Sequence, residues 1–444
     1  MRVQTHCPSQ TPGSPNPRLR CSVLLLGCPK NRVDAEHILG TTARAGLLPC
    51  ADPTQADIIV VTTCAFLESA RRESEAAIRR ALALKRRDPG RRVVVFGCHV
   101  QHSGPALARR FPLVDLWIGR DRLLELPRLL AAPDSKPGPC RLPDSHTPRL
   151  LSTPGHYAYL RIADGCDNRC AYCLIPSIRG PLHSRPIPDL VNEARTLADT
   201  GVRELILIAQ DTTAYGNDRR DKTTLARLLD RLGRIPGIEW IRLMYAHPAH
   251  LGEDVIDQLA SNPKLCRYLD LPIQHISDRI LAAMNRRCTR ADIELCLEQL
   301  RAIPGMHIRT TVMTGFPGET AAEFRELLDF IRSARFDRLS GFAFSSEPGT
   351  AAATLPNPVP AQVRAARLAR IMREQARISR ANLRRLVGCE LEAIVDYPGT
   401  GRTRWDAPEI DGIVRLQGRA APPGSIVRCR VIASSTHDLQ ARVL

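Results

Sequence analysis

Runs of apolar, β-branched residues that alternate with helical stretches constrain the fold of this 444-residue chain more than any other feature. Three such runs lie near the amino terminus, at 21–27, 57–63 and 92–97, and a helical stretch at 68–87 separates the second from the third. Continuous β-branched runs connected by helices are typical of a parallel sheet that is buried on both faces. We therefore predict an α/β domain with a parallel sheet over residues 20–131.

The same alternation resumes after the first third of the chain. Strands are predicted at 157–162, 204–209, 240–245, 268–271, 307–313 and 339–344. Helices are predicted between and after them, at 186–200, 222–233, 250–260, 290–302 and 319–334. Repeated βα units of this length predict a partial (β/α) barrel of the TIM type, with its chemistry at the carboxyl ends of the strands.

Composition shifts divide the chain into five segments. Residues 1–19 are rich in Pro, Ser and Thr and are expected to be a disordered extension, and residues 132–151, rich in Pro, Ser and Gly, read as a linker. The barrel is expected over 152–377. A small antiparallel β-barrel is expected over 378–444, because short strands with Gly and Pro turns follow a long basic helix at 360–386. The predicted class is therefore multidomain α/β, with a Rossmann-like first domain.

Each of the three amino-terminal strands ends at a cysteine. Cys28, Cys64 and Cys98 stand about thirty-five residues apart in the sequence. Because the carboxyl ends of parallel strands form the binding crevice of an open sheet, these thiols can converge in space. The helices that follow are expected to favour the thiolate form. The alternative is that a cysteine after a buried strand is only a small apolar residue.

Cys166, Cys170 and Cys173 form a Cys-x3-Cys-x2-Cys motif that follows the first strand of the predicted barrel. Three thiolates can hold three corners of a cubane iron–sulfur cluster, which normally takes four cysteines, so one iron stays open for another ligand. An open metal position is typical of a catalytic site. A zinc knuckle is the alternative, and it would need a fourth ligand such as His183, which lies in a different segment.

Charge and composition restrict the partners. The net charge is +17, carried mostly by Arg, which suits a phosphate-rich partner such as RNA or the ribosome. A genomic bias toward Arg would explain the same charge. No apolar run approaches the ~20 residues of a membrane span and no secretory signal is visible, so we expect a cytoplasmic protein without membrane contact. The fifteen cysteines are expected to be reduced.

Together, these motifs resemble those of the radical S-adenosylmethionine (SAM) methylthiotransferases, from about residue 20 to the end. The strings around Cys28 (Gly-Cys-Pro-Lys-Asn-Arg-Val-Asp), Cys64 (Thr-Thr-Cys-Ala-Phe) and Cys98 (Gly-Cys-His-Val-Gln) are similar to the family's auxiliary-cluster motifs. Thr62 departs from the pattern, because the family usually has Asn there. The resemblance implies two 4Fe-4S clusters, with Cys28, Cys64 and Cys98 as ligands of the auxiliary one, and a carboxy-terminal TRAM domain.

Four strings resemble the branch of the family that modifies an aspartate of ribosomal protein S-twelve in the small subunit. They are residues 27–31, 209–216, 269–278 and 407–412. The other branch, which modifies adenosine in tRNA, typically has different residues at 210–213 and 274–277. The acidic turn at 408–411 also suits a basic ribosomal protein, because its carboxylates would repel phosphate.

The resemblance implies a mechanism. The cluster on Cys166, Cys170 and Cys173 binds SAM and cleaves it reductively, and the resulting radical removes a hydrogen from the β-carbon of the target aspartate. The auxiliary cluster delivers sulfur, and a second SAM donates the methyl group. Such a C–H bond is hardly acidic, so the cofactors must supply the chemistry.

Further contacts with SAM are expected from residues beside the cluster and at the mouth of the barrel. Tyr172 stands where the family places an adenine contact, or it is a packing aromatic. Gln210 and Asp211 end a strand and could hold the amino group or ribose of SAM, although a strand-end Asp is often a helix cap. Gly315 and Gly318 would let the backbone approach the cofactor, or they only make a turn. His275 is a weaker candidate for substrate contact.

The expected partners are ribosomal protein S-twelve, the ribosomal subunit that contains it, and an electron donor. A monomer is the default expectation. Two rival functions remain open at this point. One is tRNA adenosine methylthiolation, which the net charge and the small β-barrel favour. The other is a non-enzymatic iron–sulfur protein for RNA binding or electron transfer, which would need closed clusters.

Overall fold

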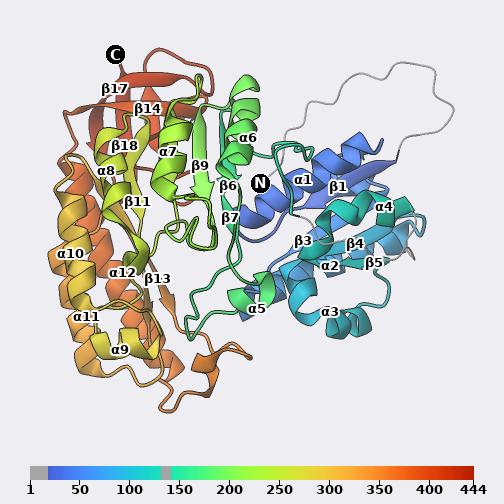
Figure 1. Ribbon diagram of the computed structural model, residues 1–444, viewed down its shortest axis with the longest axis horizontal. Helices are drawn as coiled ribbons and strands as arrows, with labels where there is room; N and C mark the ends of the chain where they lie inside the picture. The colour runs from blue at the N-terminus through green and yellow to red at the C-terminus, as the bar shows by residue number, and fades with distance from the viewer. Residues whose placement is uncertain (1–18, 132–141) are drawn as a thin grey trace. The chain divides into compact units, whose positions relative to one another are not determined.

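The computed structural model describes residues 19–131 and 142–444, which form two compact units (Figure 1). The first unit contains the amino-terminal part up to Thr153 together with Leu174–Gly180, and the second contains the rest. The predicted extension at 1–19 therefore lies outside the described residues except for Leu19, as does the first half of the predicted linker.

The first unit is built on a five-stranded sheet in the order β2-β1-β3-β4-β5, in which all neighbouring strands run parallel. Its strands are β1 (Arg20–Leu24), β2 (Leu48–Pro49), β3 (Ile58–Thr63), β4 (Arg92–Gly97) and β5 (Leu116–Ile118). β3 is buried along its whole length because helices cover both faces, as its unbroken β-branched sequence predicts.

The helices of this unit follow from local sequence signals. They are α1 (Pro29–Arg44), α2 (Glu68–Arg87), α3 (Cys98–Arg110) and α4 (Leu126–Ala131), with short 3-10 turns η1 (Pro53–Gln55) and η2 (Arg120–Glu125). α1 begins with a proline at its first position, where no backbone donor is needed. α2 has Glu68 in its first turn and three basic residues in its last, an arrangement that the helix dipole stabilises.

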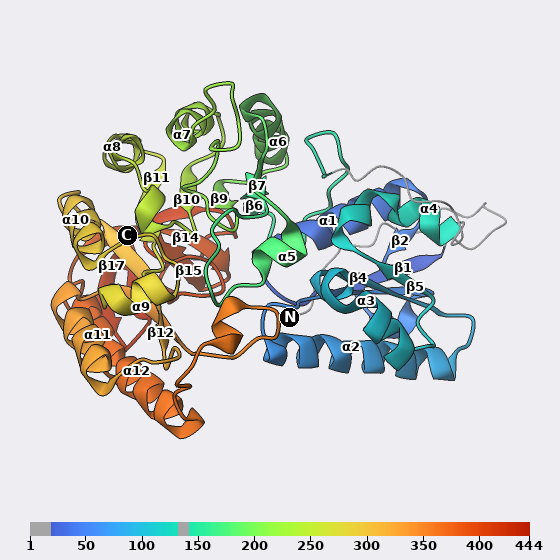
Figure 2. The ribbon, with the colours of Figure 1, turned by 60° about the horizontal axis from the view of Figure 1, so that its bottom comes forward.

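The second unit contains a six-stranded parallel sheet in the order β6-β9-β10-β11-β12-β13, with helices in an arc around it (Figure 2). Its strands are β6 (Tyr157–Arg161), β9 (Glu204–Ile208), β10 (Trp240–Leu243), β11 (Leu265–Asp270), β12 (His307–Thr314) and β13 (Arg338–Ala343), with a short hairpin of β7 (Ala163–Asp164) and β8 (His183–Ser184). The helices of this part are α6 (Ile187–Asp199), α7 (Leu225–Gly233), α8 (Glu253–Ser261), α9 (Asp278–Ala283), α10 (Arg290–Arg301), α11 (Ala321–Ala334) and α12 (Ala361–Arg384), with 3-10 turns η3 (Pro248–His250) and η4 (Ala351–Thr354). The predicted partial barrel is confirmed.

A closed five-stranded barrel completes the second unit, as predicted, except that the pairing of Val414–Gln417 with Leu439–Val443 is parallel and the barrel is therefore not wholly antiparallel. It consists of β14 (Glu390–Tyr397), β15 (Thr400–Thr403), β16 (Val414–Gln417), β17 (Ile426–Ser434) and β18 (Leu439–Val443). A buried ion network connects it to the parallel sheet: Glu204 on β9 pairs with Arg242 and with Arg402, both at 2.8 Å. Within the described residues, no helix is both long and apolar enough to cross a bilayer.

Candidate active site

Cys28, Cys64 and Cys98 follow the carboxyl ends of β1, β3 and β4, three neighbouring strands of one parallel sheet. Cys28 caps the amino terminus of α1 and Cys98 is the first residue of α3. The convergence that strand order predicts is present, because the side chain of Asn31 lies 3.9 Å from the Cys28 sulfur and 3.8 Å from the Cys98 sulfur.

Asn31 organises this group of thiols. Its Nδ2 donates to the carbonyl oxygens of Leu26 and Thr63, both at 3.1 Å, so the amide ties the ends of β1 and β3 together. The Asn31 Oδ1 atom is then directed toward the sulfurs. Gly27 permits this approach, since it has a φ of +93° and an added Cβ would lie 2.5 Å from the Asn31 amide nitrogen. Nearby, the Thr62 hydroxyl accepts from Leu26 N at 2.9 Å, so the residue that departs from the family pattern also holds the end of β1.

Arg179 places a positive charge beside the same thiols. It lies in the short helix α5 (Ile175–Arg179), which belongs to the first unit. One guanidinium nitrogen donates to Asn31 Oδ1 at 3.0 Å and to the Cys98 sulfur at 3.4 Å, and it lies 3.7 Å from Asp34. We did not predict this role for Arg179, although it stands in a string beside the second cysteine motif. A cationic donor at a sulfur is the kind of outer contact that orients metal ligands and stabilises the negative charge of a cluster.

The thiol pKa values correct one sequence-based expectation. We expected the adjacent helix starts to favour thiolate. Burial instead raises the pKa of Cys64 to about 11, and burial also raises the pKa of Cys98 despite the nearby Arg179. The expectation is wrong for these two thiols in the protein without metal, because desolvation disfavours the charged form more than the nearby Arg179 favours it. A bound metal would therefore have to displace their protons.

The second triad, Cys166, Cys170 and Cys173, lies on the loop after the β7 strand, and each of the three residues is partly exposed. The loop is fixed by neighbouring elements: Ala171 N donates to Met284 O at 2.9 Å, and Asn285 Nδ2 donates to Arg169 O at 2.7 Å. Burial raises the pKa of Cys166 to about 11. Three thiols on one anchored loop fit an iron–sulfur cluster with one open iron.

Tyr172 packs in an apolar group with Met284, Phe316 and Phe344. Burial raises its pKa above the ordinary value, so the phenol stays neutral. The buried Arg286 lies beside both Tyr172 and Cys170. We did not predict this position, because the sequence shows only two adjacent arginines there. The surroundings of Tyr172 therefore agree with the alternative that it is a packing aromatic. Its contact with SAM stays a prediction.

Two glutamine side chains at the carboxyl end of the parallel sheet have buried oxygen atoms without a hydrogen-bond partner among the described residues. They are Gln210 Oε1, after β9, and Gln274 Oε1, after β11. Gln274 also has a φ of +66°, a backbone conformation that few residues other than glycine adopt. Buried polar groups normally have a partner, so unpaired acceptors here fit a ligand that brings donors, such as an ammonium or a hydroxyl. SAM carries both kinds of group.

Asp211 organises the neighbouring loop. Its Oδ1 accepts from Thr213 N at 3.0 Å and Thr213 Oγ1 at 2.6 Å, while its Oδ2 accepts from Asn168 Nδ2 at 2.6 Å and His250 Nδ1 at 2.7 Å. Asn168 stands between Cys166 and Cys170, so the carboxylate ties the cysteine loop to β9. Asp211 thereby holds a turn, and the helix-cap alternative is wrong because the next helix, α7, begins at Leu225 with Thr224 as its cap. Direct contact of Asp211 with SAM stays a prediction.

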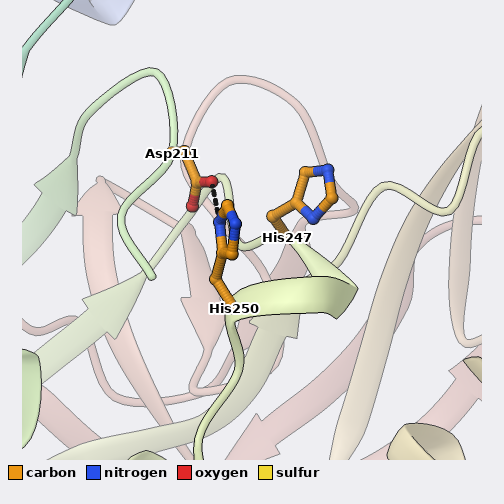
Figure 3. A group of neighbouring side chains, drawn as sticks. All are labelled: Asp211, His247 and His250. Carbon is orange, nitrogen blue, oxygen red and sulfur yellow. Dashed lines mark hydrogen bonds and ion pairs between the residues drawn. The ribbon is translucent and has the colours of Figure 1, made fainter. Parts of the chain in front are cut away.

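His247 and His250 complete this group (Figure 3). Their rings are stacked with centroids 4.9 Å apart, and with Asp211 they place three possible metal-ligand atoms within 4.8 Å. Hydrogen bonds already use these atoms, since His247 Nδ1 accepts from Ala249 N at 3.1 Å. Burial lowers the pKa of His247 to about 3, so it is neutral. The two histidines therefore hold Asp211 and its loop in place through hydrogen bonds. Their position just after β10 is the sequence signal that could have predicted this role.

The other predicted site residues lie at the ends of neighbouring strands. Gly315 follows β12 with a φ of +72°, and an added Cβ would lie 2.1 Å from the Arg364 side chain. Its amide donates to the carboxylate of Glu319, which closes the turn. Gly318 has a φ of +78°, with nothing nearer than 3.7 Å to an added Cβ. His275 is buried, and its Nδ1 accepts from Ser277 N at 3.0 Å. Cofactor contact by the two glycines stays a prediction.

The acidic turn at 408–411 corrects a second expectation. We expected its carboxylates to face a basic partner. Asp411 instead accepts from the Tyr268 hydroxyl at 2.7 Å and lies 3.4 Å from Arg309, and only 2% of its side chain is exposed. Its charge is compensated inside the second unit. Of the two acidic residues in this turn, only Glu409 is exposed. The expectation that the turn docks a basic ribosomal protein is therefore wrong for Asp411.

Family models match three parts of the chain. The Radical SAM superfamily model matches residues 160–331, the model described as Uncharacterized protein family UPF0004 matches residues 20–119, and the TRAM domain model matches residues 387–444. The first of these models covers most of the six-stranded sheet and the second triad. The second covers the five-stranded sheet and the first triad, and the third covers the small barrel. The chain therefore has the radical SAM core and the TRAM domain that its motifs resemble, together with the SAM and two iron–sulfur clusters that this family implies.

Curated relatives match nearly the whole chain. The ribosomal protein uS12 methylthiotransferase RimO of Anaeromyxobacter sp. (strain K) is 44% identical over 431 residues, covering 94% of this chain and 92% of that one. The RimO of Syntrophus aciditrophicus (strain SB) is 43% identical, covering 95% and 98%. Among solved structures, the radical SAM methyltransferase TsrM from Kitasatospora setae has a TM-score of 0.57 at 16% identity, covering 76% of this chain and 74% of that one, and so supports the fold alone. With two triads, a radical SAM core and relatives of this identity over its length, the chain belongs to the RimO family of radical SAM methylthiotransferases.

Proposed function

We propose that this chain attaches a methylthio group to the β-carbon of an aspartate in ribosomal protein uS12. The relatives that match it over nearly its whole length are named for the methylthiotransferase reaction on that protein. The single observation that carries the proposal is the presence of two separate cysteine triads, one at the strand ends of the first unit and one on a loop of the second. A closed electron-transfer site would need a fourth ligand in each.

Cys166, Cys170 and Cys173 would hold the cluster that binds SAM, and Cys28, Cys64 and Cys98 would hold the auxiliary cluster. When bound, these groups would supply the radical that removes hydrogen from an unactivated C–H bond and the sulfur that takes its place on the carbon. The protein's own residues keep the ligands in place. Asn31 positions two of the auxiliary thiols.

Gln210 and Gln274 are the best-placed acceptors for the amino and hydroxyl groups of SAM, because their buried oxygens lack a partner among the described residues. Asp211 holds the loop that carries the second triad through Asn168. Tyr172, Gly315 and Gly318 are further candidates. We propose a cytoplasmic monomer that receives electrons from a separate donor protein.

Mass spectrometry of uS12 tests this function. A strain without the gene should lack the methylthio mass increment on its uS12 aspartate peptide, and the wild-type gene should restore it. Cys98→Ser should fail to restore the increment, whereas Cys389→Ser, at an exposed cysteine, should succeed. If the increment persists without the gene, the proposal fails. If methylthiolated tRNA nucleosides disappear instead, the tRNA activity is the correct one.

A further inference from the structure

Five exposed arginines form a stripe along α12. They are Arg370, Arg373, Arg377, Arg380 and Arg384, all on the exposed side of the helix. Their spacing alternates between three and four residues, which places them on one face. The buried residues of the helix, including Ile371, Gln375 and Ile378, lie on the opposite face. At a rise of ~1.5 Å per residue, the stripe is about 21 Å long.

Little negative charge compensates this stripe. Within the part of α12 that carries it, Glu374 is the one acidic residue, and it lies 3.2 Å from Arg332 of α11 and 3.8 Å from Arg377. Arg380 makes a neutral contact, with the Thr436 hydroxyl at 2.9 Å. By comparison, three exposed arginines elsewhere in the second unit have close carboxylate partners: Arg234 pairs with Asp230 at 2.8 Å, and Arg428 and Arg430 pair with Glu390 at 2.8 and 2.6 Å.

The surface between the arginines is hollowed and lined by small residues. A hollow of about 670 Å³ is bordered by Arg377, Arg380, Arg384 and Arg385, with Ala376 and Ala381 between them. Alanines leave room for a bulky backbone to approach the guanidinium groups. α12 packs through its apolar face against α11 and β13. Of the five stripe arginines, Arg370 also lies over the Phe324 ring of α11, with its guanidinium carbon 5.9 Å from the ring centroid.

We propose that this arginine stripe binds the phosphate backbone of structured RNA. Planar guanidinium groups donate two parallel hydrogen bonds to phosphate oxygens, and a row of them at helical spacing can follow a backbone. An anionic membrane surface suits the stripe less, because membrane helices insert an apolar face and the apolar face of α12 is already packed. A protein partner would need large apolar or aromatic anchors between the guanidinium groups, and the hollow between them is bordered by the alanines Ala376 and Ala381 instead.

The inference goes beyond methylthiolation, because it requires neither triad. The proposed target of this enzyme is a ribosomal protein. The stripe would add a second binding site, which recognises the RNA around that protein independently of its sequence. RNA binding and uS12 modification can therefore fail separately. A variant that lacks the stripe should still modify free uS12.

The test compares two full-length triple variants with the same loss of charge. Arg373→Gln/Arg377→Gln/Arg384→Gln removes the stripe. Arg234→Gln/Arg428→Gln/Arg430→Gln removes three arginines that carboxylates already pair, and it serves as the matched control. Fluorescence anisotropy with a dye-labelled RNA hairpin, over a series of salt concentrations, gives the affinity and its salt dependence. Circular dichroism confirms that both variants remain folded.

The stripe variant should bind the hairpin at least about tenfold more weakly, and the slope of log K against log salt should fall by about two to three, roughly one for each lost phosphate contact. The control should change affinity less than about twofold. Equal losses in the two variants, or no loss in the stripe variant, would overturn the proposal. So would equally tight, stripe-dependent binding to phosphatidylserine vesicles, because the surface would then recognise anionic membranes in general.

Discussion

Two asparagines organise the two cysteine triads at the scale of single residues. Asn31 directs its carbonyl oxygen toward the sulfurs of Cys28 and Cys98, and Asn168 anchors the loop of the second triad to Asp211. Both are neutral, so they position ligands without adding charge. Outer contacts of this kind typically change metal affinity by about 10- to 100-fold when they are removed.

Asn31→Ala should weaken the auxiliary site without affecting the other triad. The measurement uses a background in which Cys166, Cys170 and Cys173 are alanine, so that all bound iron reports on the auxiliary site. Iron should be lost to a chelator about tenfold faster in the Asn31 variant. Asn168→Ala is the matched control and should leave that rate unchanged. Equal rates in both variants would show that Asn31 does not support the thiols.

Glu204 is a buried carboxylate on which two arginines depend. Glu204→Gln leaves Arg242 and Arg402 without this partner in the interior, which should lower the free energy of unfolding by about 3–5 kcal/mol at pH 7. Glu239→Gln, which breaks an exposed pair with Arg203 at 3.7 Å, should cost less than about 0.5 kcal/mol. Urea unfolding of the two variants measures this difference, and similar values for both would contradict it.

The pH dependence of that difference follows from the Glu204 pKa. Burial alone would raise this pKa, but the charges of Arg402 and Arg242 outweigh burial, and the pKa lies below its ordinary value of 4.5. A lowered folded-state pKa stabilises the protein above the unfolded-state value, and this contribution is lost as the pH falls through the folded-state value. The difference between wild type and Glu204→Gln should therefore be constant from pH 7 to about pH 5 and shrink only in stronger acid. A difference that already shrinks between pH 7 and pH 6 would contradict the assignment.

At the scale of elements, the connection between β15 and β16 attaches the small barrel to the parallel sheet. Trp405 stacks on His307 with ring centroids 4.1 Å apart, and the Arg404 carbonyl accepts from Arg242 at 2.8 Å. Asp411 adds the bonds to Tyr268 and Arg309 described above. The small barrel is therefore a fixed part of the second unit, and the acidic turn is mainly a structural contact.

Asp411→Asn and Glu409→Gln test that role within one turn. The Asp411 variant leaves Arg309 with less compensation and should lower stability by about 3 kcal/mol. The exposed Glu409 should contribute less than about 0.5 kcal/mol. Differential scanning calorimetry should show a lower Tm for the first variant only. A drop in uS12 binding for Asp411→Asn with an unchanged Tm would instead restore the docking interpretation.

At the scale of the whole molecule, the architecture follows from the sequence more directly than the site does. The helix at 68–87 has the predicted bounds, and the convergence of Cys28, Cys64 and Cys98 follows from the parallel strand order alone. The contacts of Arg179 and His250 could not be predicted in this way, because they join residues far apart in sequence through side-chain hydrogen bonds. Burial, which sequence patterns indicate only coarsely, reversed the expected shift of the Cys64 pKa.

The central claim is that the chain holds two independent three-cysteine sites and needs both for one reaction. Iron content and uS12 modification, measured together on two triple-alanine variants, test it most directly. We predict that the Cys28/Cys64/Cys98 variant and the Cys166/Cys170/Cys173 variant each retain about half of the wild-type iron. Neither variant should methylthiolate uS12. Complete loss of iron from either variant, or methylthiolated uS12 from either one, would contradict the claim.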